Sequence, residues 1–110
     1  MPFPNPKLIP KNWSKLTLAA QLANIGSEVS RAMHWFKDKE KANQQKAAER
    51  VLDLIDLVIA DQRWRKNLLE ITRLRETLCD FFFGQNIYQT TSKNLQDYFL
   101  PFALMSRKIL

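Results

Sequence analysis

Apolar residues recur at helical intervals in four stretches of the chain. Between residues 14 and 37 their spacing alternates between four and three residues, at Leu18, Leu22, Ile25, Val29, Ala32 and Phe36. This heptad-like spacing predicts a helix that packs nearly parallel to its neighbours. We expect Ser14 or Thr17 to cap its first turn. Gly26 lies beside the apolar face and costs a helix about 1 kcal/mol relative to Ala, so we expect a close helix crossing there.

Two further helices are predicted, on either side of Asp61. The first covers residues 43–60, with an inner face formed by Ala47, Val51, Leu54, Ile55 and Val58. The second covers residues 62–83, with apolar positions at Trp64, Leu68, Ile71, Leu74, Leu78, Phe81 and Phe82. Asp61 is expected to cap the junction between them, and Gly84 to end the second.

The last predicted helix starts after Thr91 or Ser92, either of which is a suitable cap. Its apolar positions are Leu95, Phe99, Phe102, Met105 and Ile109. Pro101 lies inside this run, so we expect either a kink or a split into two helices there.

Residues 1–13 are predicted to form an extended arm, because prolines at positions 2, 4, 6 and 10 oppose helix formation. Only 2 glycines are present in 110 residues, too few for the many turns of a β-sandwich or barrel. The sequence therefore predicts an all-α protein, an antiparallel up-down four-helix bundle over residues 14–110. A three-helix bundle, with the second and third helices fused through Asp61, is the alternative.

The residues that usually carry chemistry are scarce. Cys79 is the single cysteine and His34 the single histidine, which excludes a disulfide within the chain and a zinc site built on paired thiolates. Glycines at positions 26 and 84 alone form no phosphate-binding loop. We therefore expect no metal, no cofactor and no enzymatic activity; catalysis by His34 and Cys79 is the alternative. No apolar run is long enough to cross a bilayer and no signal peptide is evident, so we expect a cytoplasmic protein outside the membrane.

The formal net charge of +6 favours a polyanionic partner such as RNA or DNA. Basic side chains are frequent on the third predicted helix, where Arg63, Lys66 and Arg73 form one stripe that Glu70 interrupts. We take four as candidate phosphate contacts, namely Arg63, Lys66, Arg73 and Arg75. Aromatic side chains at Trp13, Trp35, Trp64 and Tyr88 are candidate stacking surfaces for bases. A solvated face without a partner is the alternative interpretation.

The apolar side chains exceed what one seam can bury. Three consecutive phenylalanines point in directions about 100° apart on a helix, so they cannot share one face. We therefore expect a homo-oligomer or a protein partner, with an interface at Trp13, Phe81, Phe82 and Phe83.

Charged residues beside the apolar faces are expected to form interhelical ion pairs, with a polar ligand pocket as the alternative; they include Glu28, Arg31, Asp53, Asp56, Arg73, Arg75, Glu76 and Asp80.

Three segments, residues 21–31, 61–64 and 73–84, look like those of uncharacterised small prokaryotic helical proteins. In size, charge and helix count the chain also resembles the four-helix bundle proteins encoded in 23S rRNA intervening sequences and the Avd-like accessory proteins of retroelements. That resemblance implies a basic oligomeric bundle that works with nucleic acid, and it assigns no residue a role. The leading hypothesis is therefore a non-catalytic accessory or scaffold that binds RNA or DNA. The alternative is a protein–protein adaptor or defence-system component without nucleic-acid binding.

Overall fold

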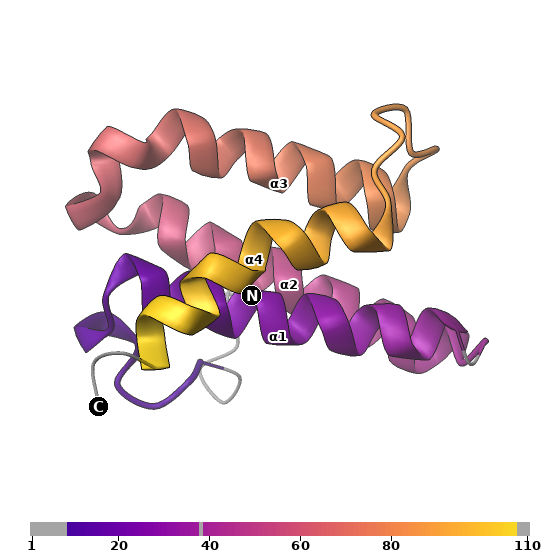
Figure 1. Cartoon of the computed structure of the whole chain (residues 1–110), viewed down its shortest axis with the longest axis horizontal. Helices are drawn as coiled ribbons and strands as arrows, with labels where there is room; N and C mark the ends of the chain where they lie inside the picture. The colour runs from indigo at the N-terminus through magenta and orange to yellow at the C-terminus, as the bar shows by residue number, and fades with distance from the viewer. Residues whose placement is uncertain (1–8, 38, 108–110) are drawn as a thin grey trace, which may run out of the picture.

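The computed structural model describes residues 9–37 and 39–107, and these contain helices and connections but no strand. The elements are η2 (Trp13–Lys15), α1 (Leu18–Lys37), α2 (Lys41–Ala60), η3 (Gln62–Asn67), α3 (Leu68–Phe83) and α4 (Ser92–Arg107), where η marks a 3₁₀ helix. Four α-helices alternate in direction along the chain (Figure 1), which confirms the predicted all-α, up-down four-helix fold. A three-helix bundle is wrong because α2 ends at Ala60 and Asp61 has an extended backbone.

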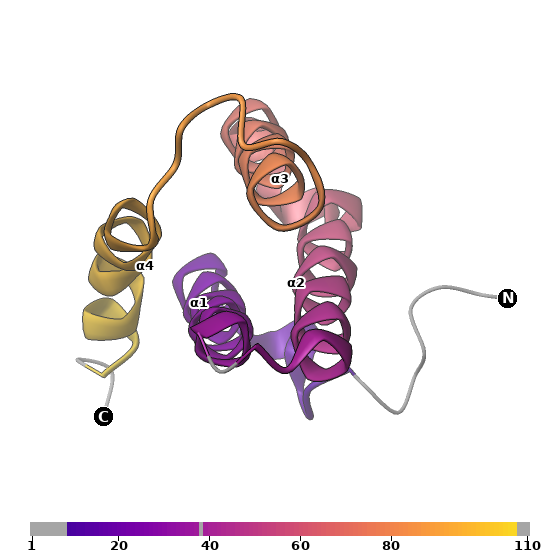
Figure 2. The same ribbon diagram turned by 90° about the vertical axis from the view of Figure 1, so that its right-hand side faces the viewer.

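The bundle is open on one side. Helix α1 packs along both α2 and α4, and α2 packs on α3, whereas α3 and α4 make at most marginal contact. Viewed along the helices, α4, α1, α2 and α3 follow one another around a curve whose two ends do not close (Figure 2). One of the four sides expected of an up-down bundle is therefore missing.

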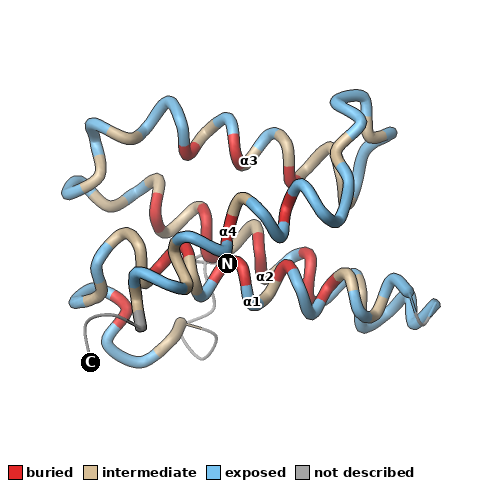
Figure 3. Tube along the Cα trace, viewed as in Figure 1, coloured by how far each residue is buried: buried red, intermediate tan, exposed pale blue. Residues whose placement is uncertain are grey.

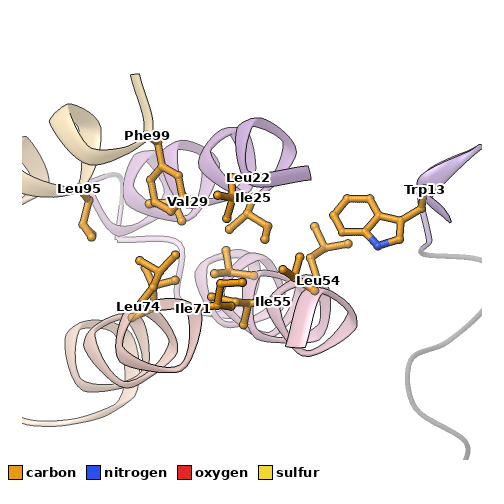
Figure 4. Packing of buried hydrophobic residues seen from close by; sticks show 13 residues of the cluster. Trp13, Leu22, Ile25, Val29, Leu54, Ile55, Ile71, Leu74, Leu95 and Phe99 are labelled. Carbon is orange, nitrogen blue, oxygen red and sulfur yellow. The ribbon is translucent and has the colours of Figure 1, made fainter. Parts of the chain in front are cut away.

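The core is formed mainly by α1 and α2, with fewer residues from the other two helices (Figure 3). All five residues predicted for the inner face of α2 are buried, and so are four of the six predicted for α1. The middle of the core contains side chains from all four helices (Figure 4), among them Ile25, Ile55, Ile71 and Phe99. Helical periodicity therefore identified the central layers correctly.

Residues near the ends of the predicted faces are more exposed than expected. Phe36 at the end of α1 is 58% exposed, and Met105 near the end of α4 is 53% exposed. Both lie beyond the last buried residue of their helices, Ala32 in α1 and Phe99 in α4. Ile109, also predicted for this face, lies outside the described residues.

Side-chain caps begin α1 and α4 as predicted. The Thr17 hydroxyl accepts a hydrogen bond from the Ala20 N–H at 3.1 Å. The Thr91 hydroxyl accepts one from the Asn94 N–H, and the Asn94 side-chain oxygen accepts one from the Thr91 N–H, both at 3.0 Å. Each cap satisfies backbone donors that have no partner within the helix itself.

The third helix differs from its prediction because it begins as 3₁₀ helix. Asp61 caps η3 by accepting the Arg63 N–H at 3.0 Å, as expected. Trp64 then departs from helical geometry (φ −105°, ψ 21°), so the 3.6-residue period does not continue from η3 into α3. As a result Trp64 is half-buried and Leu68, predicted for the core, is 41% exposed.

Gly26 lies at the close crossing that its position predicted. A β-carbon there would come within 2.8 Å of the Phe99 Cβ and 2.9 Å of its Cγ, so α4 approaches α1 more closely than any larger residue allows.

Pro101 lies inside α4, which runs without interruption from Ser92 to Arg107. A split into two helices at Pro101 is therefore wrong.

The segment before α1 folds onto the bundle. Trp13 is only 6% exposed and belongs to the hydrophobic core of its own chain, and Ile9 packs against that core. Residues 1–8 of the predicted arm lie outside the described residues, and residues 11–12 form a turn, closed by the Trp13 N–H donating to the Pro10 carbonyl at 3.1 Å, that leads into η2. Since the Trp13 ring is covered by its own domain, it offers almost no surface to a partner.

Candidate nucleic-acid interface

Two of the four predicted phosphate contacts, Arg63 and Arg75, are engaged within the domain. The Arg75 guanidinium binds both carboxylate oxygens of Asp56 on α2, at 2.6 and 3.2 Å. The Arg63 guanidinium binds Asp61, at 2.6 Å for the shortest contact, and donates to the Leu16 carbonyl at 3.1 Å. Hydrogen bonds from Arg63 hold the pKa of Asp61 below its usual value, so the pair keeps its charges in acid where an unpaired aspartate begins to take up a proton.

The other two, Lys66 and Arg73, are exposed and form no ion pair within the described residues. Both face the space between α3 and α4 together with Glu70. Glu70 accepts a hydrogen bond from the Tyr98 hydroxyl of α4 at 3.0 Å. The stripe expected on one helix is therefore divided: Arg63 pairs with Asp61, whereas Lys66 and Arg73 lie on either side of Glu70 at the space between α3 and α4.

A buried amide joins the two 3₁₀ helices. Gln21 is fully buried; its side-chain N–H donates to the Trp13 carbonyl at 2.9 Å, and its side-chain oxygen accepts the Trp64 indole N–H at 2.9 Å. The guanidinium of Arg63 lies 4.4 Å from the centre of the Trp64 ring. Through these contacts and the Arg63 bond to Leu16, η2 and η3 lie together at one end of the bundle.

This end carries a concentration of positive charge. Residues 11–16 and 61–67 contain five basic side chains and one acidic one, a net charge of +4 of the chain's +6. Asp61, the acidic one, is already paired with Arg63. The four remaining side chains are exposed and unpaired among the described residues; they form what we call the basic end, Lys11, Lys15, Arg65 and Lys66.

Three of these residues, Lys11, Lys15 and Arg65, are absent from the set predicted on the third helix. The two lysines are distant from that helix in sequence, and only the Gln21 and Arg63 contacts bring them to it. The excess positive charge of the first residues was the available signal in the sequence. It did not reveal which other segment lies beside them.

The aromatic side chains offer fewer stacking surfaces than expected. Trp13 is buried, one neighbour of the half-buried Trp64 ring is the Arg63 guanidinium, and Trp35 is half-buried with an edge-on contact to His34. Tyr88, in the connection between α3 and α4, is 60% exposed. Of the four predicted stacking residues, Tyr88 therefore presents most of its ring to solvent.

The predicted partner interface is mostly occupied by contacts within the domain. Phe81 and Phe82 are half-buried, pack against the core and meet edge to face, with ring centres 5.0 Å apart. Phe83 is 46% exposed at the end of α3. Three consecutive phenylalanines do point in different directions, but two of the three reach the bundle's own core.

Of the eight charged residues predicted to form interhelical pairs, three do so, Glu28, Asp56 and Arg75, whereas Arg31 pairs with Glu28 within α1 at 3.5 Å. Glu28 of α1 accepts from Arg50 of α2 at 3.2 Å, and Asp56 of α2 pairs with Arg75 of α3. Asp80 has a different role, because its carboxylate accepts the backbone N–H groups of Ile87 and Tyr88 at 2.8 and 3.1 Å. Glu28 and Asp56 therefore connect neighbouring helices, and Asp80 shapes the connection to α4.

The groups considered for chemistry are separated. His34 lines a hollow between the ends of α1, α3 and α4, whereas Cys79 lines another beside Asp80 and Phe83. In residues 9–37 and 39–107, no cluster of three or more His, Cys, Asp or Glu side chains is arranged to hold a metal ion. No helix in that part of the chain combines the length and apolar character that a membrane crossing requires.

Comparison with known proteins returns no match to a protein-family model, to a curated protein or to a solved structure. The resemblance to ribosomal-insertion and retroelement accessory proteins therefore stays a prediction.

Proposed function

We propose that this protein is a non-catalytic helical bundle that binds RNA or DNA by contacting phosphates with its basic end. The observation that carries the proposal is that the segments with Lys11 and Lys15 and with Arg65 and Lys66 are joined at one end of the bundle, and that these four side chains are exposed and unpaired within the described residues. Phosphate groups are spaced closely along a nucleic acid, so a compact set of cations engages several at once. The protein would then serve as an accessory or scaffold for an enzyme that acts on nucleic acid.

Other basic regions of the chain are less suitable. Four lysines occur around the turn between α1 and α2, but Asp38 and Glu40 alternate with them in the sequence, and residues 37–46 have a net charge of only +2. Arg75 would have to leave Asp56 to reach a phosphate. Desolvating and separating such a bidentate pair opposes binding.

The basic end is suited to phosphates more than to bases. Bases are read by hydrogen bonds to their edges or by stacking on exposed aromatic rings. The two tryptophans at this end are buried or half-buried, so neither presents a free ring. We therefore expect similar affinities for nucleic acids of different sequence.

The test is the salt dependence of binding, measured by fluorescence anisotropy with a labelled RNA or DNA hairpin. If four side chains each neutralise one phosphate, the association constant should fall about 50- to 150-fold between 50 and 200 mM salt. Replacing Lys11, Lys15, Arg65 and Lys66 by Ala should abolish most of the binding and flatten the salt dependence.

A variant with the same change in charge provides the control. Replacing Lys37, Lys39, Lys41 and Lys46 by Ala also lowers the formal net charge from +6 to +2, but at the opposite end of α1. This variant should retain most of the affinity. Equal losses in the two variants would mean that overall charge, and not the basic end, attracts nucleic acid. Absence of binding by the parent protein would favour the adaptor alternative.

A further inference from the structure

The open side of the bundle contains a cleft. It has a volume of about 590 Å³ and lies between α3 and α4, with the buried residues Leu74 and Leu95 at its floor. The Tyr98–Glu70 hydrogen bond spans it. In a closed up-down bundle the fourth helix packs against both the first and the third. Here α4 packs along α1 only, so the face of α3 that would contact α4 is left without a neighbouring helix.

Apolar side chains remain uncovered around this cleft. Leu69 on α3 is 65% exposed, and Tyr88 in the connection to α4 is 60% exposed. Both line the cleft together with the floor residues. Exposed apolar side chains gathered at one cleft with a polar rim are typical of a site that binds another protein surface.

The charges on the same face of α3 alternate in sign. Lys66, Glu70 and Arg73 follow at intervals of four and three residues, which places them on one side of the helix, and all three line the cleft. A nucleic acid would meet the Glu70 carboxylate in the middle of this row. In an antiparallel second copy of α3 centred between positions 71 and 72, Glu70 and Arg73 would lie opposite each other, and Lys66 would lie opposite the uncharged Thr77.

We propose that a second copy of this chain covers the cleft, in a two-fold symmetric dimer in which the α3 helices of the two copies pack antiparallel. With the symmetry axis between positions 71 and 72, Glu70 faces the partner's Arg73, and Leu69 faces the partner's Leu74. Each cleft then receives the exposed leucine of the other copy, and two equivalent ion pairs flank this contact. Such an isologous contact needs one self-complementary patch, which the row on α3 provides.

The first test measures subunit number by light scattering and sedimentation. The parent protein should be a dimer, and Leu69→Asp should be a monomer whose helix content by circular dichroism is unchanged. Leu104→Asp is the matched control, because Leu104 is 47% exposed on α4 and does not line the cleft. It should remain a dimer. A monomeric parent protein, or loss of the dimer in Leu104→Asp instead of Leu69→Asp, would overturn the proposal.

The second test uses charge reversal and also distinguishes this dimer from other pairings. Glu70→Arg alone and Arg73→Glu alone each create two like-charged contacts, which should raise the dimer dissociation constant about a hundredfold. Mixing the two single variants should restore a heterodimer, because every facing pair is again of opposite sign. The chain carrying both changes should dimerise with itself. Failure of the mixture to associate would refute the arrangement.

These variants leave the basic end intact, so the two proposals are tested separately. A monomer that still binds nucleic acid would leave the proposed function in place. Capture of a different protein by the cleft, with the parent chain monomeric, would contradict the second copy as its occupant.

Discussion

The buried amide of Gln21 provides a quantitative test of how the two 3₁₀ helices are held. Leucine at this position has nearly the same size and fits a fully buried site, but it neither donates nor accepts a hydrogen bond. In Gln21→Leu the Trp64 indole N–H loses its acceptor. The Trp13 carbonyl loses one of two donors, since it still accepts the Leu16 N–H at 3.1 Å.

The expected cost follows from these two losses. An unsatisfied, partly buried N–H costs about 1–2 kcal/mol, and a carbonyl that keeps one donor loses about 0.5–1 kcal/mol. We therefore expect Gln21→Leu to lower the free energy of unfolding by about 2 kcal/mol. In a Trp64→Phe background the indole donor is absent, so the same change should cost about 1 kcal/mol less.

The assay is urea unfolding followed by far-UV circular dichroism for the parent, both single variants and the double variant. Asn24→Leu, at an exposed position one turn further along α1, is the control and should stay within about 0.5 kcal/mol of the parent. A double-mutant coupling close to zero would show that the Gln21–Trp64 bond does not stabilise the junction. This bond would then not be what holds η2 beside η3 at the basic end.

Two further predictions concern the core and the charged surface. Gly26→Ala should gain about 1 kcal/mol of helix propensity but cost about 1–3 kcal/mol through overpacking against Phe99, so thermal melting should show a net loss of stability. The control is Ser27→Ala, at the exposed neighbouring position, which should show no loss of stability. A Gly26→Ala variant more stable than the parent would contradict the close crossing. For Asp53, burial and then the Asp56 and Glu49 carboxylates raise the pKa, with Arg50 opposing them. A carboxyl whose pKa is higher in the folded state destabilises the fold once pH rises above its unfolded value near 4, and the full effect is present above the folded pKa. Asp53→Asn should therefore be more stable than the parent in urea unfolding at pH 7 and equal to it at about pH 3; a difference independent of pH would contradict this assignment.

Helical periodicity predicted which residues are buried wherever burial depends only on the spacing of apolar residues within one helix. The inner face of α2 and the middle of α1 follow directly from it, as do the caps at Thr17 and Thr91. The break at Trp64 does not, because the apolar pattern continues through it while the backbone changes to 3₁₀ helix. Nor does the burial of Gln21, a polar residue whose partners lie 8 and 43 positions away.

The surface was less predictable because it depends on which segments meet. Arg63, Lys66, Arg73 and Arg75 are equivalent in a sequence pattern, yet the fold pairs two of them with Asp61 and Asp56 and leaves two free. The basic end requires η2 and η3 to lie side by side, and the spacing of apolar residues along the chain does not indicate this. The open side arises because α4 packs along α1 and makes only marginal contact with α3, and this arrangement depends on tertiary contacts such as that between Gly26 and Phe99.

The most direct test of the proposed function is a map of where nucleic acid binds, obtained from backbone amide NMR shifts of the ¹⁵N-labelled protein titrated with a short hairpin. The largest shifts should occur in residues 11–16 and 61–67 and should disappear as salt is raised. Shifts centred on the α1–α2 turn or the outer face of α4, or no shifts at low salt, would contradict the assignment of the basic end as the binding surface.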